Sequence, residues 1–144
     1  MDVIIRKAES RDIPDLIALN DEFNGVGSTI MSMEEALKAD NEIVIVAVVA
    51  GKVVGFICGL YWRSICYADG FQGIITELFV NENYRRNGIA AKIIAGLEDE
   101  FVCLNVREIT LATPLDNYVG RKFYESCGYN DREEMVYDKT LFSE

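Results

Sequence analysis

Apolar residues along the chain fall into two kinds of run, one with the spacing of a strand and one with the spacing of a helix. The run "IVIVAVVA" at residues 43–50 is continuous and β-branched, which is typical of a strand covered on both faces. "AGK" then turns the chain into the apolar residues 53–62, and this predicts a hairpin. Shorter β-rich runs predict further strands at residues 3–8, 74–80, 107–113 and 133–141.

Helical spacing marks four further segments. The strongest is residues 89–102, where apolar residues recur at every fourth position. A first helix follows the cap-like sequence "SRDIP", and a second begins near Ser32, with Glu35 at the capping-box position. The last helix follows Asn117 and ends at Gly128, which suits a C-terminal cap.

The order of the expected elements is β-α-α-β-β-β-α-β-α-β. It combines strand-helix-strand units with antiparallel hairpins, and it therefore predicts an α/β (α+β) protein with a mixed sheet and helices on both faces. The chain has 144 residues, half of them apolar, and shows no repeat or interdomain linker. We expect a single domain spanning residues 1–144.

Charge and cysteine usage limit the classes of partner. There are 14 Lys and Arg residues against 24 Asp and Glu, a net charge of −10, which argues against nucleic acid or an anionic membrane as a partner. The N-terminus is too short and too charged for a signal peptide, and no apolar run approaches the ~18 residues of a membrane span. The four cysteines form no C-x-x-C pair. We expect a cytoplasmic protein with reduced thiols, as a monomer or a homodimer.

The absence of histidine excludes several chemistries at once. Ser-His-Asp and Cys-His catalysis and histidine-ligated zinc cannot be built from this chain, and no metal site is predicted. The sequence also lacks the phosphate-loop and G-x-G-x-x-G patterns. A catalyst here must use carboxylates, tyrosines, cysteines, lysines or backbone groups.

The stretch "YRRNGIAAKII" at residues 84–94 concentrates positive charge at a helix start in an acidic chain. The first turn of a helix presents unpaired N–H groups and a partial positive charge, which together bind phosphate well. Gly88 permits close approach of a ligand, Ala90 leaves the first turn unobstructed, and Arg85 and Arg86 add charge. The alternative is a solvated loop with a helix-starting glycine.

Two motifs resemble the GNAT superfamily of acetyl-CoA-dependent N-acetyltransferases. "ITELFVNENYRRNGIAAKII" is similar to the family's motif A, in which Arg85, Gly88 and Ala90 match the pattern Arg or Gln, two residues, Gly, one residue, Gly or Ala. "NYVGRKFYESCGY" resembles motif B, with Asn117 and Tyr124 at the expected places. The resemblance implies the GNAT fold: a mixed, mostly antiparallel sheet of six to seven strands with about four helices, splayed between the fourth and fifth strands.

The resemblance also implies acetyl-CoA as the cofactor. Backbone groups of the motif-A strand would pair with the pantetheine arm, and the helix start would hold the pyrophosphate. The coenzyme-binding residues so implied are Leu78, Phe79, Val80, Arg85, Arg86, Asn87, Gly88, Ile89, Ala90, Asn117 and Tyr124. Tyr124 matches the family's general acid, which protonates the departing thiolate. The alternatives are that Tyr124 is a half-buried aromatic residue and that Asn117 caps its helix. A cofactor passing close by would also explain Gly120, which costs a helix roughly 1 kcal/mol relative to Ala.

An acceptor amine is mostly protonated at pH 7 and must lose a proton before it attacks. Glu77 is the candidate base, because it is the only carboxylate in "IITELFV" and lies two strand residues from Phe79 on the same face. The aminoglycoside 3-N-acetyltransferases carry an acidic residue at the same offset before a similar arginine-rich run. The alternative is a strand-end carboxylate in a salt bridge.

Acidic and aromatic residues interleave in the first helix and in the loop before residue 74. Carboxylates and aromatic rings suit a cationic amine, although a solvated acidic face over core aromatics fits the same pattern. The candidate substrate residues are Asp21, Glu22, Phe23, Tyr61 and Tyr67. We expect acetyl transfer to a primary amine, an aminoglycoside- or polyamine-like small cation, by direct attack in a ternary complex. The alternatives are a peptide or protein amine as acceptor and a catalytically silent acetyl-CoA-binding regulatory module.

Overall fold

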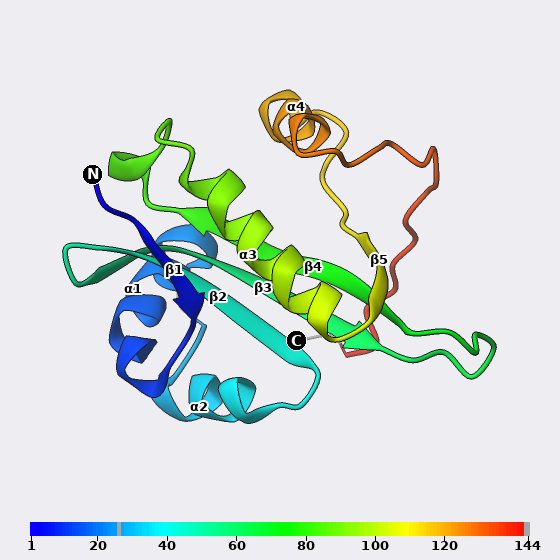
Figure 1. Cartoon of the computed structure of the whole chain (residues 1–144), viewed down its shortest axis with the longest axis horizontal. Helices are drawn as coiled ribbons and strands as arrows, with labels where there is room; N and C mark the ends of the chain where they lie inside the picture. Colours follow the sequence, from blue (N-terminus) through cyan, green and yellow to red (C-terminus); the bar gives the residue numbers. More distant parts are fainter. Residues whose placement is uncertain (26, 143–144) are drawn as a thin grey trace. The chain divides into compact units, whose positions relative to one another are not determined.

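The computed structural model describes residues 1–25 and 27–142, in two compact units, Met1–Thr110 and Leu111–Glu144. The first unit holds the sheet and three α-helices, and the second holds the fourth helix (Figure 1). The strands are β1 (Ile4–Lys7), β2 (Glu42–Val49), β3 (Lys52–Trp62), β4 (Phe71–Val80) and β5 (Val106–Thr110). The helices are α1 (Ile13–Asn24), α2 (Ile30–Lys38), α3 (Ile89–Cys103) and α4 (Tyr118–Ser126), with short 3-10 helices η1 (Ser10–Asp12) and η2 (Glu82–Tyr84).

The strands form one sheet in the order β1-β2-β3-β4-β5. The first three pairings are antiparallel, and β4 pairs with β5 in parallel. This confirms the predicted mixed, mostly antiparallel sheet and its four α-helices. The described part of the chain contains five strands, fewer than the six to seven expected.

The missing strand is the segment at residues 133–141, where the sequence prediction was wrong. In the described residues this segment has no strand ladder, and the side chains of Met135, Val136 and Tyr137 are exposed. A strand forms only when its backbone groups pair with those of a neighbour. Strand-like composition alone does not provide that neighbour.

The side chains of β3 alternate between two hydrophobic layers. On one face, a cluster joins β3 to α1, and it consists of Leu16, Leu19, Val46, Val48, Val53, Phe56 and Phe79. On the other face, Gly59 and Gly73 lie against Phe101 of α3, and a Cβ atom built at these glycines would lie 2.7 Å and 2.9 Å from its ring. Larger residues at these positions would therefore push α3 away from the sheet.

The second helix starts differently from the prediction. Its N-cap is Thr29, whose Oγ1 accepts the N–H of Ser32 at 3.0 Å, while Ser32 Oγ accepts the N–H of Thr29 at 2.9 Å. This reciprocal pair is a capping box, so Ser32 is its third helical residue, and Glu35 has no part in it. The prediction was based on the spacing between Ser32 and Glu35, and it did not include Thr29, which precedes them.

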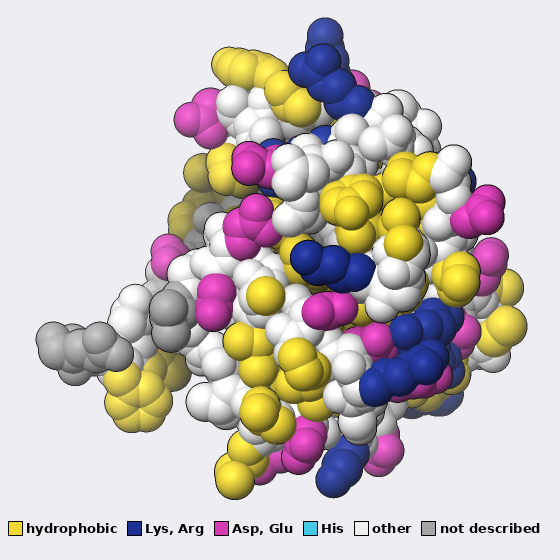
Figure 2. All heavy atoms as spheres, turned by 90° about the vertical axis from the view of Figure 1, so that its left-hand side faces the viewer, with side chains coloured by type: hydrophobic (Ala, Val, Ile, Leu, Met, Phe, Trp, Pro, Cys, Tyr) yellow, Lys and Arg dark blue, Asp and Glu magenta, His cyan; other side chains and the backbone are white. Residues whose placement is uncertain are grey.

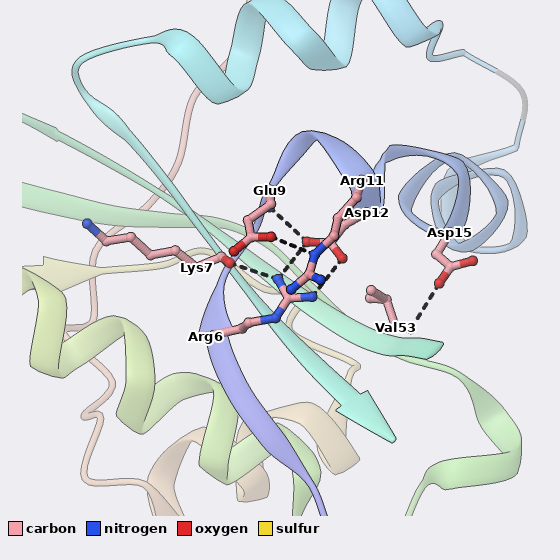
Figure 3. Close-up of polar contacts among 7 residues, drawn as sticks. All are labelled: Arg6, Lys7, Glu9, Arg11, Asp12, Asp15 and Val53. Carbon is pink, nitrogen blue, oxygen red and sulfur yellow. Dashed lines mark hydrogen bonds and ion pairs between the residues drawn. The ribbon is translucent and has the colours of Figure 1, made fainter. Parts of the chain in front are cut away.

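Helix α1 is fixed to the sheet by polar contacts at its start (Figure 3). The carboxylate of Asp12 accepts two hydrogen bonds from the Arg6 guanidinium, at 2.7 Å and 2.9 Å, and one from the N–H of Glu9 at 2.7 Å. One turn later, Asp15 Oδ2 accepts the N–H of Val53 at 3.0 Å. These contacts tie the helix to β1 and to the start of β3.

The Arg6–Asp12 pair is expected to make stability depend on pH. Burial alone would raise the pKa of Asp12, but hydrogen bonds from Arg6 and Glu9 and the nearby positive charges outweigh it and hold that pKa below its usual range. The stabilisation is therefore present above about pH 4, the usual pKa of an unfolded aspartate, and is lost as pH falls through the lower folded pKa. We expect Asp12→Asn to lower the free energy of unfolding by about 2 kcal/mol at pH 7, measured by urea denaturation.

As pH falls through the lowered folded pKa of Asp12, the free energies of unfolding of wild type and Asp12→Asn are expected to converge. Glu9→Gln is the control, because the Glu9–Arg11 pair is exposed, with side-chain exposures of 53% and 69%. Such surface pairs contribute little to stability. A difference between wild type and Asp12→Asn that is independent of pH would contradict the proposed role of the charge.

Candidate active site

The second half of β4 has an open edge. β3 pairs with β4 along most of its length, up to Val80, whereas β5 pairs only with Phe71–Ile74. Within the described residues of the first unit, the β5 side of residues 75–80 has no strand partner. The predicted splay between the fourth and fifth strands is therefore confirmed.

The backbone groups at that edge can be assigned from the alternation of an antiparallel strand. The N–H of Asn81 donates to Val54 O at 2.8 Å, so the N–H and C=O groups of Leu78 and Val80 point away from β3. The carbonyl oxygen of Val80 agrees with this assignment, because it accepts a 2.9 Å hydrogen bond from Arg85 Nε. An extended chain lying along this edge would find the backbone groups of Leu78 and the N–H of Val80 to pair with.

The loop after β4 leads directly into an uncapped helix. Gly88 is the N-cap of α3, with φ +71°, and no side chain caps the helix there. A Cβ atom built at Gly88 would have nothing within 4 Å, so the space in front of the first turn is open. Arg86 also has a positive φ, of 65°, which is uncommon for a residue other than glycine. The N–H groups of the first turn are therefore available to an anion.

The side chains around this loop have distinct positions. Both Arg85 and Arg86 are exposed. Arg85 Nε donates a hydrogen bond to the carbonyl oxygen of Val80, and the guanidinium carbon of Arg85 lies 5.5 Å from the centre of the Phe79 ring. Asn87 donates to the carbonyl oxygens of Tyr84 and Arg85, both at 3.1 Å, and so holds the loop in shape. The Ile89 side chain is buried in the core, which leaves only its backbone for a ligand.

A β-bulge orients Glu77. The register between β3 and β4 shifts after Cys58, where Thr76 is an extra residue whose Oγ1 donates to Cys58 O at 3.2 Å. As a result, Ile75 and Glu77 face opposite sides of the sheet although they are two residues apart. Glu77 lies opposite Cys58, on the face that also holds Phe79, as the sequence predicted for Glu77 and Phe79.

Two carboxylates lie near Cys58 on this face. Burial raises the pKa of the Cys58 thiol to about 12, and the negative charges of Glu42 and Glu77 contribute. Burial also raises the pKa of Glu42. The thiol is therefore protonated and unreactive at neutral pH. Sequence analysis missed Glu42, which lies at the start of β2 with no motif around it.

The end of α1 meets the end of β4. The rings of Phe23 and Phe79 stack with centroids 4.9 Å apart, and Glu22 Oε2 accepts a 3.2 Å hydrogen bond from Asn81 Nδ2. Asp21 Oδ1 is buried and has no hydrogen-bond partner among the described residues. The structure therefore brings Glu22 and Phe23 to the end of the strand that holds Glu77.

The predicted substrate residues of the β3–β4 region lie elsewhere. Tyr61 packs edge-on against Phe101 of α3, with centroids 6.1 Å apart, so it is on the face opposite Glu77. Its hydroxyl donates to Asp40 O at 2.7 Å. Tyr67 is exposed in the loop between β3 and β4. The structure thus does not bring Tyr61 to Glu77.

Two cavities lie away from residues 81–88, the loop between β4 and α3. One, of about 390 Å³, lies between β1 and α3, and one of about 200 Å³ lies beside the start of β2. The residues that line them include none of the predicted site residues. The candidate coenzyme site of the first unit is therefore an open strand edge and loop, not either of these cavities.

In the second unit, Asn117 caps α4. Its Oδ1 accepts the N–H of Gly120 at 3.1 Å, and its Nδ2 donates to Thr113 Oγ1 at 3.0 Å. A Cβ atom built at Gly120 would lie 2.4 Å from Asn117 Nδ2, so the folded-over cap explains this glycine. The idea that a cofactor requires Gly120 is therefore unnecessary. Gly128, with φ +93°, follows the end of the helix as predicted.

Tyr124 lies on α4, half-buried. Burial raises the pKa of its hydroxyl, and the neighbouring Cys127 raises it further. Its ring lies 5.4 Å from that of Phe123 and 6.3 Å from that of Tyr129, centroid to centroid. The phenol therefore keeps its proton at neutral pH and can act as a proton donor.

The family to which the chain belongs follows from comparison with known sequences. The acetyltransferase (GNAT) family matches residues 11–129. An acetyltransferase of Photorhabdus laumondii is 34% identical over 113 residues, which are 77% of this chain and 74% of that protein. An acetyltransferase of Sodalis glossinidius is 33% identical over 106 residues, which are 74% of this chain and 70% of that protein. The chain belongs to the GNAT family and is an N-acetyltransferase.

Solved structures share its fold. An aminoglycoside 6'-N-acetyltransferase from Acinetobacter baumannii superposes with a TM-score of 0.82 at 16% identity, covering 99% of this chain and 100% of that one. An aminoglycoside acetyltransferase from a soil metagenome, in complex with sisomicin, gives 0.86 at 20% identity, covering 98% and 97%. An aminoglycoside N-acetyltransferase bound to a CoA-S-monomethyl-acetylneamine bisubstrate analogue gives 0.86 at 18%, covering 99% and 100%. At these identities the similarity establishes the fold.

The surface and helices set the kind of environment that the chain presents. On the face drawn in Figure 2, Asp and Glu side chains are interspersed with Lys, Arg and hydrophobic side chains, so no single sign of charge covers it. On this face, attraction of a charged ligand would therefore depend on individual residues. None of the helices within residues 1–25 and 27–142 combines the length and hydrophobicity that crossing a bilayer requires.

Proposed function

We propose that this N-acetyltransferase transfers the acetyl group of acetyl-CoA to a primary amine of a small cationic molecule, by direct attack in a ternary complex. The observation that supports this most is the continuity of two backbone features. The open edge of β4 at Leu78 and Val80 leads, within one short loop, to the uncapped first turn of α3. A ligand with an amide-containing arm and a pyrophosphate would match both features at once.

The coenzyme-binding residues fit this ligand. The N–H groups of residues 86–90 would hold the pyrophosphate, assisted by the exposed charge of Arg86 and the free end of the Arg85 guanidinium. The backbone of residues 78–80 would pair with the pantetheine arm. When bound, acetyl-CoA would supply the activated thioester. Asn117 is proposed to act through its cap, which fixes the start of α4.

Two side chains are proposed to move protons. Glu77 would accept the proton that the acceptor ammonium loses, directly or through a water molecule, and thereby produce the neutral amine that attacks. Tyr124 would donate its phenolic proton to the departing thiolate, a role supported by its match to motif B and by its raised pKa. A backbone N–H at the β4 edge would stabilise the negative charge that develops on the carbonyl oxygen.

The acceptor is proposed to be cationic because α1 and β4, which meet at Phe23 and Phe79, both carry carboxylates. Asp21, Glu22 and Glu77 belong to these two elements, and Phe23 would add aromatic surface. The solved structures of aminoglycoside acetyltransferases, which share the fold, are consistent with such an acceptor. We also propose a cytoplasmic location, supported by four cysteines without a disulfide-like spacing.

Turnover with a panel of amines tests the proposed function. The panel includes a polyamine, an aminoglycoside, a free peptide N-terminus and a lysine-containing peptide, with thiol release and acetyl incorporation into the acceptor as readouts. We expect turnover with the polyamine or the aminoglycoside. Turnover with the peptides alone would replace the proposed acceptor by a peptide or protein amine. Binding of acetyl-CoA without turnover of any amine would indicate a regulatory module.

A further inference from the structure

The end of α1 makes two contacts with the end of β4 and the start of the coenzyme loop, which is the segment 81–88 between β4 and α3. The proposed function does not require these two contacts. Phe23 stacks on Phe79 at 4.9 Å, with 29° between the ring planes. Glu22 accepts a hydrogen bond from the side chain of Asn81, the residue at which β4 passes into the loop. Both contacts join α1, the helix that carries the proposed acceptor residues, to residues that precede or shape the coenzyme loop.

The residues contacted on the sheet in turn hold the loop. The guanidinium of Arg85 lies over the Phe79 ring, with its carbon 5.5 Å from the centroid, and Arg85 Nε is bonded to Val80 O. Asn81 caps η2, because its Oδ1 accepts the N–H of Asn83 at 2.9 Å. Phe79 and Asn81 therefore contact α1 and also hold the loop: Phe79 contacts Arg85, and Asn81 caps η2.

The contacts start from a fixed helix. The beginning of α1 is bonded to β1 through Arg6 and Asp12 and to β3 through Asp15, so its far end is held at a defined position over β4. Phe23 is nevertheless 43% exposed. A ring that is this exposed contributes little to burial of the core. It can still stabilise the arrangement of Phe79 and Arg85 through aromatic stacking.

We propose that Phe23, with Glu22, is a positioning residue for coenzyme binding: it acts through Phe79 and Asn81 on the conformation of Arg85 and the loop, without touching the coenzyme. The inference rests on the proposed acetyl-CoA site. Loss of the stack allows Arg85 and the loop to sample other conformations, and ordering them again on binding weakens the affinity for the coenzyme.

The experiment measures the dissociation constant of CoA by titration calorimetry, in the absence of acceptor. Phe23→Ala is expected to weaken CoA binding about three- to tenfold, the range that an aromatic pair contributes. Phe23→Tyr, which keeps the ring, is expected to bind CoA within about twofold of wild type. Met31→Ala is the matched control, since Met31 is an apolar residue on α2 with 70% exposure, and it is expected to leave CoA binding unchanged.

Two further measurements separate positioning from a general loss of structure. In steady-state kinetics with the acceptor saturating, Phe23→Ala is expected to raise KM for acetyl-CoA by a factor similar to its loss of CoA affinity, and Phe23→Tyr to restore it. Glu22→Ala provides a second variant, with an expected two- to threefold weakening of CoA binding from the lost hydrogen bond. Wild-type affinity in Phe23→Ala, or affinity in Phe23→Tyr as weak as in Phe23→Ala, would overturn the inference. Absence of CoA binding by the wild type would instead overturn the proposed function.

Discussion

Replacing Glu77 by glutamine is expected to lower kcat about 100-fold at pH 7, with both substrates saturating. General base catalysis typically contributes 10²- to 10⁴-fold, and an alkylammonium with a pKa of ~10 is almost fully protonated at pH 7. Glutamine keeps the shape of the side chain opposite Cys58 but cannot accept the proton. Initial rates with the best amine of the panel measure the effect, and CoA binding by the variant is expected to match wild type.

The pH dependence of this loss identifies its cause. As pH rises from 7 toward 9.5, solvent deprotonates more of the amine, so the difference between wild type and Glu77→Gln is expected to shrink. Glu42→Gln is the matched control, because the charges of Glu42 and Glu77 both act on Cys58. We expect Glu42→Gln to retain kcat within about threefold of wild type. Equal losses in the two variants would show that local negative charge matters and would remove Glu77 as the base.

Replacing Tyr124 by phenylalanine is expected to lower kcat by a comparable factor, on the order of 100-fold. The substitution keeps the ring against Phe123 and Tyr129 and removes only the hydroxyl. Burial and Cys127 raise the pKa of this hydroxyl, so the wild-type phenol stays protonated through the neutral and mildly alkaline range. The wild-type rate is therefore expected to fall only at a pH above the ordinary tyrosine pKa of about 10, and Tyr124→Phe to lack that fall.

A second tyrosine on the same helix provides the control. Tyr118 is 68% exposed and has Arg121 over its ring, so Tyr118→Phe removes a hydroxyl from α4 without a predicted role in catalysis. Its kcat is expected to stay within about twofold of wild type. If Tyr124→Phe also turned over at the wild-type rate, Tyr124 would not be the general acid, and a water molecule or another group would have to protonate the thiolate.

Local patterns in the sequence were sufficient for most elements of the fold. The apolar period of residues 89–102 predicts α3 and its buried face, and the run at residues 43–50 predicts β2, because each pattern records how one element meets the core. The strand expected at residues 133–141 was wrong for the converse reason. Its composition suits a strand, but a strand needs a backbone partner, and composition contains no information about partners.

Some features of the candidate site likewise follow from local sequence, and others depend on tertiary contacts. By itself, the sequence predicted the glycine N-cap and the start of α3, because Gly88 and the residues around it act through local backbone geometry. The sequence also predicted that Glu77 shares a face with Phe79, but only the tertiary structure decided that Ile75 faces the opposite side, since that depends on the bulge at Thr76 and hence on pairing with β3. The tertiary structure alone also placed Phe23 on Phe79 and left Tyr61 on the other face. Contacts between residues far apart in the chain follow from how helices and strands pack, and no local pattern specifies them.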